Sequence, residues 1–261
     1  MDLGLKGKVA LVLGAGGGLG SRIAATLTQE GARVVLADVD QAALDRVAQS
    51  LRAQGADILT LQWDLGDLAA IDARVSAIES KFGSVDILVN NTGGPPPTLI
   101  SGQELSLWSK HFESMVLSVI GITDRVLPGM RKKGWGRVIT STSSGVVAPI
   151  ANLGLSNALR ASLLGWSKTL AREEGPAGIT VNVILPGRIA TDRIRFLDQS
   201  KAKRENRAAE DVTKESTASI PLGRYGEPQE YANVVTFLAS VAASYVTGTV
   251  QRVDGGLLAN I

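Results

Sequence analysis

The sequence predicts an α/β protein built on a doubly wound, seven-stranded parallel sheet in a single domain. Short apolar runs alternate with longer amphipathic segments along almost the whole chain. Several of these runs are nearly continuous Val, Ile and Leu, which is typical of parallel strands covered on both faces. Strands that alternate with helices on this scale form right-handed βαβ units, and 261 residues suit one large domain of this class.

The individual elements follow from these patterns in chain order. The predicted strands are 8–14, 33–38, 57–64, 85–91, 136–142, 179–186 and 249–254. The predicted helices, with apolar residues at helical spacing, are 19–30, 40–54, 67–82, 104–133, 153–174 and 227–240. Gly31, Gly55 and Gly83 follow the first three helices, as expected where a helix ends. The polar insertion 190–219 is predicted to be a solvated lid, since seven basic residues nearly balance six acidic ones.

Composition limits the function classes. The formal net charge is +2, which gives no electrostatic reason to expect a nucleic acid or an anionic membrane as partner. The chain has no cysteine and one histidine, His111, so a thiol nucleophile and a His-rich metal site are not expected. His111 lies among apolar residues and is predicted to be structural. The start of the chain does not resemble a signal peptide, and the absence of cysteine fits a cytoplasmic protein.

A glycine-rich loop, "LGAGGGLGS", follows the first strand and opens the first helix. One glycine of such a loop makes the tight turn, another admits a pyrophosphate, and a third lets the helix pack on the strand. The helix N-terminus then offers N–H groups to the phosphates. A merely flexible turn is the alternative, but the flanking strand and helix favour a dinucleotide site of the Rossmann type. The predicted cofactor residues in the loop are Gly14, Gly16, Gly18, Leu19 and Gly20.

An acidic residue, Asp38, ends the second strand about 20 residues after the loop, where a carboxylate binds the ribose hydroxyls. It would repel a 2′-phosphate, and positions 15–19 hold no basic residue to receive one. We therefore expect NAD(H) in preference to NADP(H). Asp38 also suits a helix cap together with Asp40, and the two roles are compatible.

Further motifs extend the pattern: "NNTGG" at 90–94, "WDL" at 63–65 and "LPGRIATD" at 185–192. With these motifs the whole chain resembles a short-chain dehydrogenase/reductase, most of all the β-ketoacyl-(acyl-carrier-protein) reductase branch. The resemblance implies a small carbonyl or acyl substrate and a homo-oligomer, a tetramer or dimer formed through helices 104–133 and 153–174. It adds these cofactor-binding residues: Asp64, Leu65, Asn91, Gly93, Arg160, Pro186, Gly187, Ile189 and Thr191.

The catalytic positions depart from the family. Its members usually carry Asn, Ser, Tyr and Lys, and the corresponding residues here are Met115, Ser143, Ser156 and Arg160. A serine hydroxyl is a far weaker acid than a phenol with a pKa of ~10, so Ser156 cannot simply replace the tyrosine as proton donor. None of the three tyrosines rebuilds the Tyr-x-x-x-Lys spacing, although Tyr225 is placed to approach the cleft from the insertion.

The role of Arg160 stays open between two readings. In the first, its guanidinium binds an anionic group, and the hydroxyls of Ser143 and Ser156 complete the anion-binding site. In the second, the site is a relaxed former active site and Arg160 points to solvent. Three functions remain: a nicotinamide-dependent oxidoreductase with a non-standard proton donor, a catalytically silent NAD-binding sensor or scaffold, and a non-redox enzyme that binds an acid through Arg160.

Overall fold

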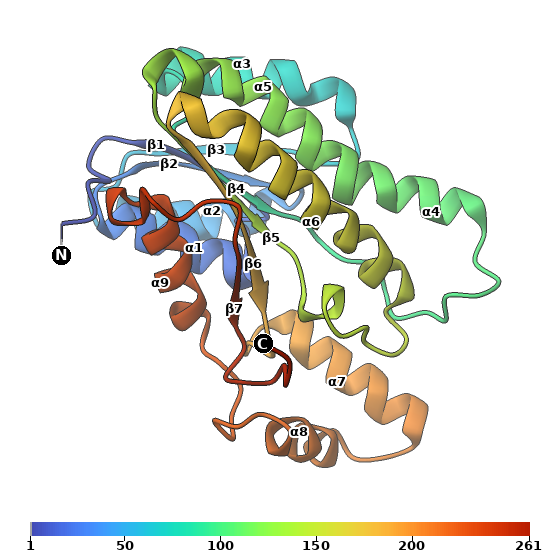
Figure 1. Ribbon diagram of the computed structural model, residues 1–261. Coiled ribbons are helices and arrows are strands. Elements are labelled where there is room, and N and C mark those ends of the chain that lie inside the picture. Colours follow the sequence, from blue (N-terminus) through green and yellow to red (C-terminus); the bar gives the residue numbers. More distant parts are fainter. Residues whose placement is uncertain (1) are drawn as a thin grey trace.

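The computed structural model describes residues 2–261, which form a seven-stranded parallel sheet between two layers of helices (Figure 1). The strand order is β3-β2-β1-β4-β5-β6-β7. The strands are β1 Val9–Leu13, β2 Arg33–Asp38, β3 Ile58–Gln62, β4 Ile87–Asn91, β5 Gly136–Ser141, β6 Ile179–Pro186 and β7 Val250–Val253. Each lies within its predicted range, so the predicted fold class is confirmed.

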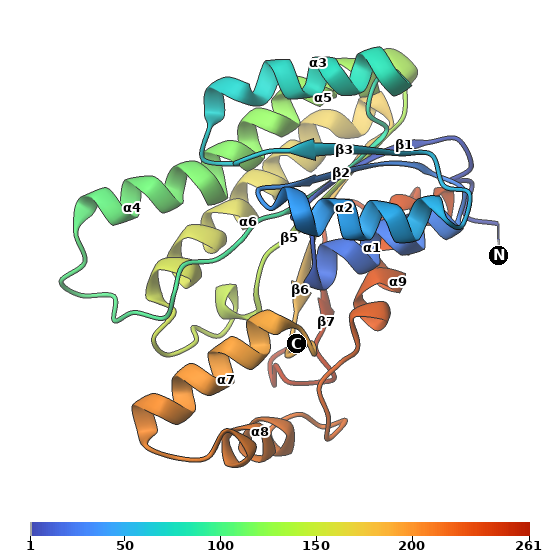
Figure 2. The same cartoon turned by 180° about the vertical axis from the view of Figure 1, so that it is seen from behind.

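The helices cover both faces of the sheet, as Figures 1 and 2 show. Their bounds are α1 Gly18–Gln29, α2 Gln41–Arg52, α3 Ile71–Phe82, α4 Leu105–Phe112, α5 Ser118–Lys133, α6 Gly154–Glu174, α7 Asp192–Glu205, α8 Ala209–Ala218 and α9 Pro228–Ala239. Helices α1, α2 and α9 pack on one face, whereas α3, α5 and α6 pack on the other. None of the helices within residues 2–261 combines the length and apolar character that a bilayer crossing requires.

Strand β1 shows why the apolar runs are continuous. Ala10 and Val12 pack into the core beneath α1, α2 and α9, whereas Val9, Leu11 and Leu13 pack beneath α3, α5 and α6. Because successive side chains of a strand point to opposite faces, a strand covered on both sides must be apolar at every position.

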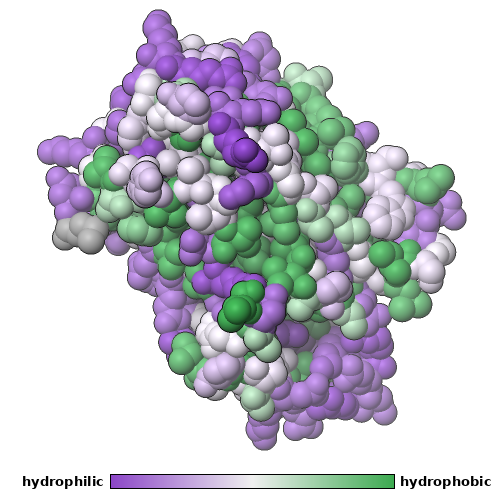
Figure 3. All heavy atoms as spheres, in the orientation of Figure 1, coloured by the Kyte–Doolittle hydropathy of each residue, from purple (hydrophilic) through white to green (hydrophobic). Residues whose placement is uncertain are grey.

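Two regions differ from the sequence expectation. The predicted helix 104–133 is divided into α4 and α5 by a turn of π-helix, Glu113–Leu117, which holds Met115. The insertion forms α7 and α8, which lie beyond the carboxyl ends of the strands and have a largely hydrophilic surface (Figure 3). This lid is not solvated throughout, because Asp198 is buried and accepts hydrogen bonds from Arg188 and Tyr225.

Candidate functional site

A cleft of about 940 Å³ lies at the carboxyl edge of the sheet, between the strand ends and α7. This is where an open α/β sheet binds its ligands, because the strand order reverses between β1 and β4. The predicted residues that line it are Gly14, Gly18, Leu19, Asp38, Asp64, Leu65, Asn91, Gly93, Met115, Ser143, Ser156, Arg160, Pro186, Gly187, Ile189 and Thr191. Gly16 and Gly20 do not line the cleft, whereas Gly17, which sequence reasoning did not single out, does.

The glycine loop forms a cradle that side chains would fill. Gly14 and Gly18 have φ of +62° and +53°, which favour glycine. A Cβ on Gly20 would overlap the carbonyl oxygen of Gly14, so this glycine lets α1 pack against the loop. Gly17 precedes α1, and no side chain caps the helix there. The first N–H groups of α1 therefore suit a phosphate, and the loop fits a dinucleotide.

Asp38 binds the glycine loop from the end of β2. Its carboxylate accepts hydrogen bonds from the backbone N–H of Gly16 at 2.9 Å and of Asp40 at 3.1 Å. Gly16 thus contacts Asp38 and does not itself face the cleft. The helix cap is Asp40, whose side chain accepts from the N–H of Ala43 at 3.0 Å. Asp38 therefore does not cap α2. It lines the cleft.

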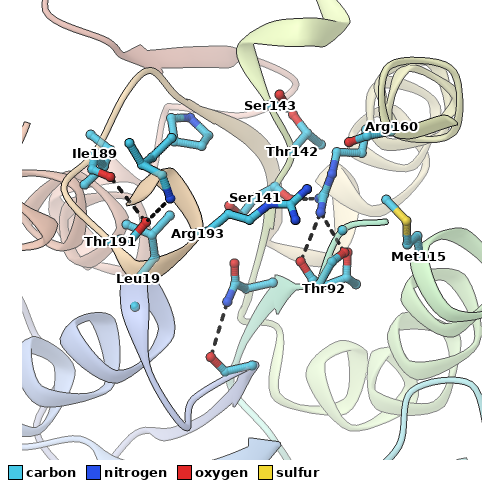
Figure 4. Close-up of a pocket in the computed structure, with 18 of the residues that line it drawn as sticks. Leu19, Thr92, Met115, Ser141, Thr142, Ser143, Arg160, Ile189, Thr191 and Arg193 are labelled. Carbon is cyan, nitrogen blue, oxygen red and sulfur yellow. Dashed lines mark hydrogen bonds between the residues drawn. The ribbon is translucent and has the colours of Figure 1, made fainter. Parts of the chain in front are cut away.

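The Arg160 guanidinium is buried at the end of β4 and β5, where Figure 4 shows it directed at Thr92 and Ser141. Nη2 donates to the carbonyls of Thr92 and Gly93 at 3.0 and 2.9 Å, and Nη1 donates to that of Ser141 at 3.2 Å. Burial lowers the pKa of Arg160 to about 10, and the nearby Arg193 contributes. The expectation that Arg160 points to solvent is wrong: its donors hold the backbone of two strand ends together.

The other catalytic positions lie around Arg160. Ser156 lies four residues earlier on the same face of α6 and is 7% exposed, and Met115 is 2% exposed. Ser143 accepts a hydrogen bond from the N–H of Gly145 at 3.1 Å and so caps a short helical turn. The structure thus brings together the four positions that the sequence singled out.

No tyrosine of residues 2–261 lines this cleft. Tyr225, predicted as a candidate to approach it, instead donates to Asp198 at 2.7 Å. Tyr231 is buried and lies 2.8 Å from the hydroxyl of Ser141. Burial raises the pKa of Tyr231, so its hydroxyl stays protonated.

Four charged or titratable side chains that line the cleft were not assigned to it from the sequence: His111, Arg188, Asp192 and Arg193. Arg193 reaches it from α7, and His111 lines it from α4. Partial burial and the neighbouring Lys110 lower the pKa of His111. No sequence signal marks Arg193 or His111, because Arg193 lies in a charged segment and His111 in an amphipathic helix.

Known proteins resemble this chain over nearly its whole length. A family model described as Enoyl-(Acyl carrier protein) reductase matches residues 14–258. The 3-oxoacyl-(acyl-carrier-protein) reductase FabG of Salmonella typhimurium is 38% identical over 257 residues, 98% of this chain and 99% of the relative. Nodulation protein G of Azospirillum brasilense is 34% identical over 253 residues, 96% of this chain and 98% of the relative.

Solved structures show the same likeness. The crystal structure of L-sorbose reductase from Gluconobacter frateurii, complexed with NADPH and L-sorbose, has a TM-score of 0.94 and 33% identity, with 100% of both chains covered. That of YwfH, an NADPH-dependent reductase involved in bacilysin biosynthesis, has a TM-score of 0.93 and 28% identity, covering 97% of this chain and 99% of that one. The chain therefore belongs to the short-chain dehydrogenase/reductase family.

Proposed function

We propose that the protein is a nicotinamide-dependent oxidoreductase, similar to 3-oxoacyl-(acyl-carrier-protein) reductases, that interconverts a small carbonyl compound and its alcohol. The observation that carries the proposal is a cleft that runs from the glycine loop and Asp38 to Ser143, Ser156 and Arg160. The end of the cleft at the glycine loop and Asp38 has the features that a dinucleotide needs. The end at Ser143, Ser156 and Arg160, where the substrate is protonated, has no phenol.

Each part of the chain has a proposed task. The glycine loop and the start of α1 bind the pyrophosphate, Asp38 the adenosine ribose, and Asp64 and Leu65 the adenine. Asn91 and Gly93 would border the adenosine ribose, and Arg160 would lie at the nicotinamide ribose. Pro186, Gly187, Ile189 and Thr191, in the loop after β6, would hold the nicotinamide carboxamide.

A bound nicotinamide supplies the hydride for carbonyl reduction and accepts it in the reverse direction. The hydroxyls of Ser143 and Ser156 hydrogen-bond the substrate oxygen and orient a water that delivers its proton. Arg160 stays charged and is held by three carbonyls, so it fixes the strand ends without exchanging a proton. Losing a positioned general acid costs about 10²–10⁴-fold in rate, so we expect slow turnover.

The same observations favour a second candidate, a catalytically silent NAD-binding sensor or scaffold, because no phenol lines the described cleft. A non-redox enzyme that clamps an acid through Arg160 alone has less support, since carbonyls already use both terminal nitrogens of its guanidinium. The proposed homo-oligomer, formed through α4–α5 and α6, is supported by exposed Leu105 and Phe112 on α4.

A measurement of NADH binding tests both functions that require the cofactor, the oxidoreductase and the silent NAD-binding protein. We expect calorimetric titration of the purified protein with NADH to show saturable, one-site binding with a dissociation constant below about 1 mM, equivalent to about 4 kcal/mol of binding energy. A panel of ketones and alcohols, followed by NADH absorbance, then separates an enzyme from a sensor. No binding at millimolar NADH would reject both readings.

Asp38 is proposed to set the preference for NADH, although the solved relatives named above carry or use NADPH. We expect Asp38→Ala to weaken NADH binding by about 10- to 100-fold, the loss of a hydrogen bond to a charged group, and NADPH binding much less. Asp38→Asn is the matched variant of similar shape, because its one amide oxygen can still accept from the N–H of Gly16, while the charge and the acceptor for the N–H of Asp40 are lost. Equal losses for both cofactors would contradict the assignment.

A further inference from the structure

Arg193 spans the cleft from the lid to the loop that follows β4. Its Nη2 donates to the carbonyl oxygen of Pro95 at 2.7 Å, and the guanidinium lies 5.7 Å from the centre of the Phe196 ring. A Cβ placed on Gly94 would lie 3.3 Å from Nη2 of Arg193 and 3.7 Å from Nη2 of Arg160. The two guanidinium groups therefore meet beside Gly94, as Figure 4 shows for their side chains.

Among residues 2–261, no acidic side chain pairs with Arg160 or Arg193. Within residues 2–261, every hydrogen bond from either guanidinium goes to a backbone carbonyl. Asp192, the acidic cleft residue nearest to Arg193 in the chain, is exposed and pairs with Arg195. Burial lowers the pKa of both Arg160 and Arg193, because desolvation disfavours the charged form. An anion that enters here therefore gains more from the pair than it would from guanidinium groups in water.

Two hydroxyls at the same strand ends also lack partners. The side-chain oxygens of Thr92, after β4, and Thr142, after β5, are buried and make no hydrogen bond within residues 2–261. Both threonines line the cleft. A buried hydroxyl without a partner is costly, so each of these hydroxyls gains a hydrogen bond if its side chain rotates toward a ligand with acceptor oxygens.

We infer that Arg193, with Thr92 and Thr142, forms a carboxylate-binding subsite and that the substrate is a short oxo acid or the corresponding hydroxy acid. Arg193 exchanges the Pro95 carbonyl for the substrate carboxylate, and Arg160 beneath it adds positive potential. The inference rests on the proposed function and narrows its substrate class. The pyrophosphate has its own cradle at Gly17 and Gly18, so the subsite is assigned to the substrate.

Matched substrates test the inference. Acetoacetate and methyl acetoacetate carry the same ketone, but only the first carries a carboxylate. In wild-type protein we expect the lower KM for the acid. Arg193→Gln should raise the KM for acetoacetate about 10- to 100-fold, the loss of a charge-assisted hydrogen bond, and change that for the ester far less. Arg193→Lys should restore part of the preference, because it keeps the charge but not the planar fork.

Arg195→Gln is the control on the same helix, since Arg195 is exposed and does not line the cleft. This variant should keep the wild-type ratio of the two KM values. Thermal unfolding of all variants shows whether the lid is still folded. Equal KM values for acid and ester in wild type, or an unchanged ratio in Arg193→Gln, would overturn the inference.

Binding gives a readout that does not need turnover. Calorimetry of acetoacetate, pyruvate and 2-oxoglutarate with NAD⁺-saturated protein should show binding of at least one, lost in Arg193→Gln. If Arg193→Gln instead weakens NADH binding tenfold, the anion is the cofactor's pyrophosphate and the inference is wrong. Failure to bind NADH at all defeats the proposed function, whereas reduction of the ester with no preference for the acid defeats only the subsite.

Discussion

A variant that combines Ser156→Tyr, Arg160→Lys and Met115→Asn is expected to reduce ketones about 10²–10⁴-fold faster than the wild type, because it restores a positioned general acid. Ser156 lines the cleft, so a phenol at this position enters the space in which the substrate is proposed to lie. The lysine ammonium four residues later lies on the same face of α6 and lowers the pKa of that phenol.

The contacts of Arg160 decide whether this variant stays folded. The guanidinium satisfies three carbonyls, those of Thr92, Gly93 and Ser141. An ammonium offers three donors, so it can satisfy the same acceptors at the cost of the planar geometry. The asparagine replaces a methionine that is 2% exposed and needs a partner of its own. We therefore expect reduced stability together with a gain in rate.

The measurement is kcat from NADH absorbance over a range of pH, with the unfolding temperature recorded for each variant. Ser156→Phe in the same background is the matched control, because it fills the same space without an acidic hydroxyl. If the phenylalanine variant is as active as the tyrosine variant, proton donation is not what limits the wild type. If both are silent although NADH binds, the substrate half of the cleft has diverged as well.

Gly20→Ala is expected to lower the free energy of unfolding by at least about 3 kcal/mol, the upper end of what overpacking costs. The added Cβ would overlap the carbonyl oxygen of Gly14 and also approach the backbone of Ala15. Both obstacles are backbone atoms in the turn between β1 and α1, so they cannot move aside as a flexible side chain does. Relief requires α1 to shift away from the sheet, which exposes part of the core beneath it.

Gly17→Ala is the control within the same loop. Nothing lies within 4 Å of a Cβ at this position, and its φ of −174° is extended. We expect a change of less than about 0.5 kcal/mol in its unfolding free energy, as for a substitution without a steric conflict. Chemical denaturation followed by fluorescence measures both variants. Equal midpoints for Gly20→Ala and wild type would show that α1 is not held against the loop as described.

The sequence was sufficient for the fold and for most of the residues that line the cleft beside the glycine loop. Continuous apolar runs such as that of β1 predict strands covered on both faces, because pleating sends alternate side chains into two cores. The glycine loop and Asp38 are recognisable for a similar reason. Their requirements are steric and local: glycines where the chain turns tightly, and an acid one strand later in the sequence. These properties depend on neighbours along the chain, so the sequence displays them.

The tertiary structure decided what the charged side chains contact. Helical spacing placed Ser156 and Arg160 on one face, but Arg160 binds the carbonyl of Thr92, which is 68 residues away. Arg193 binds that of Pro95, which is 98 residues away. An arginine looks the same in the sequence whether its guanidinium is exposed to water, paired with a carboxylate or buried beneath a strand end. Its partner depends on which distant backbone atoms the folded sheet brings within 3 Å, and no periodicity in the sequence records that.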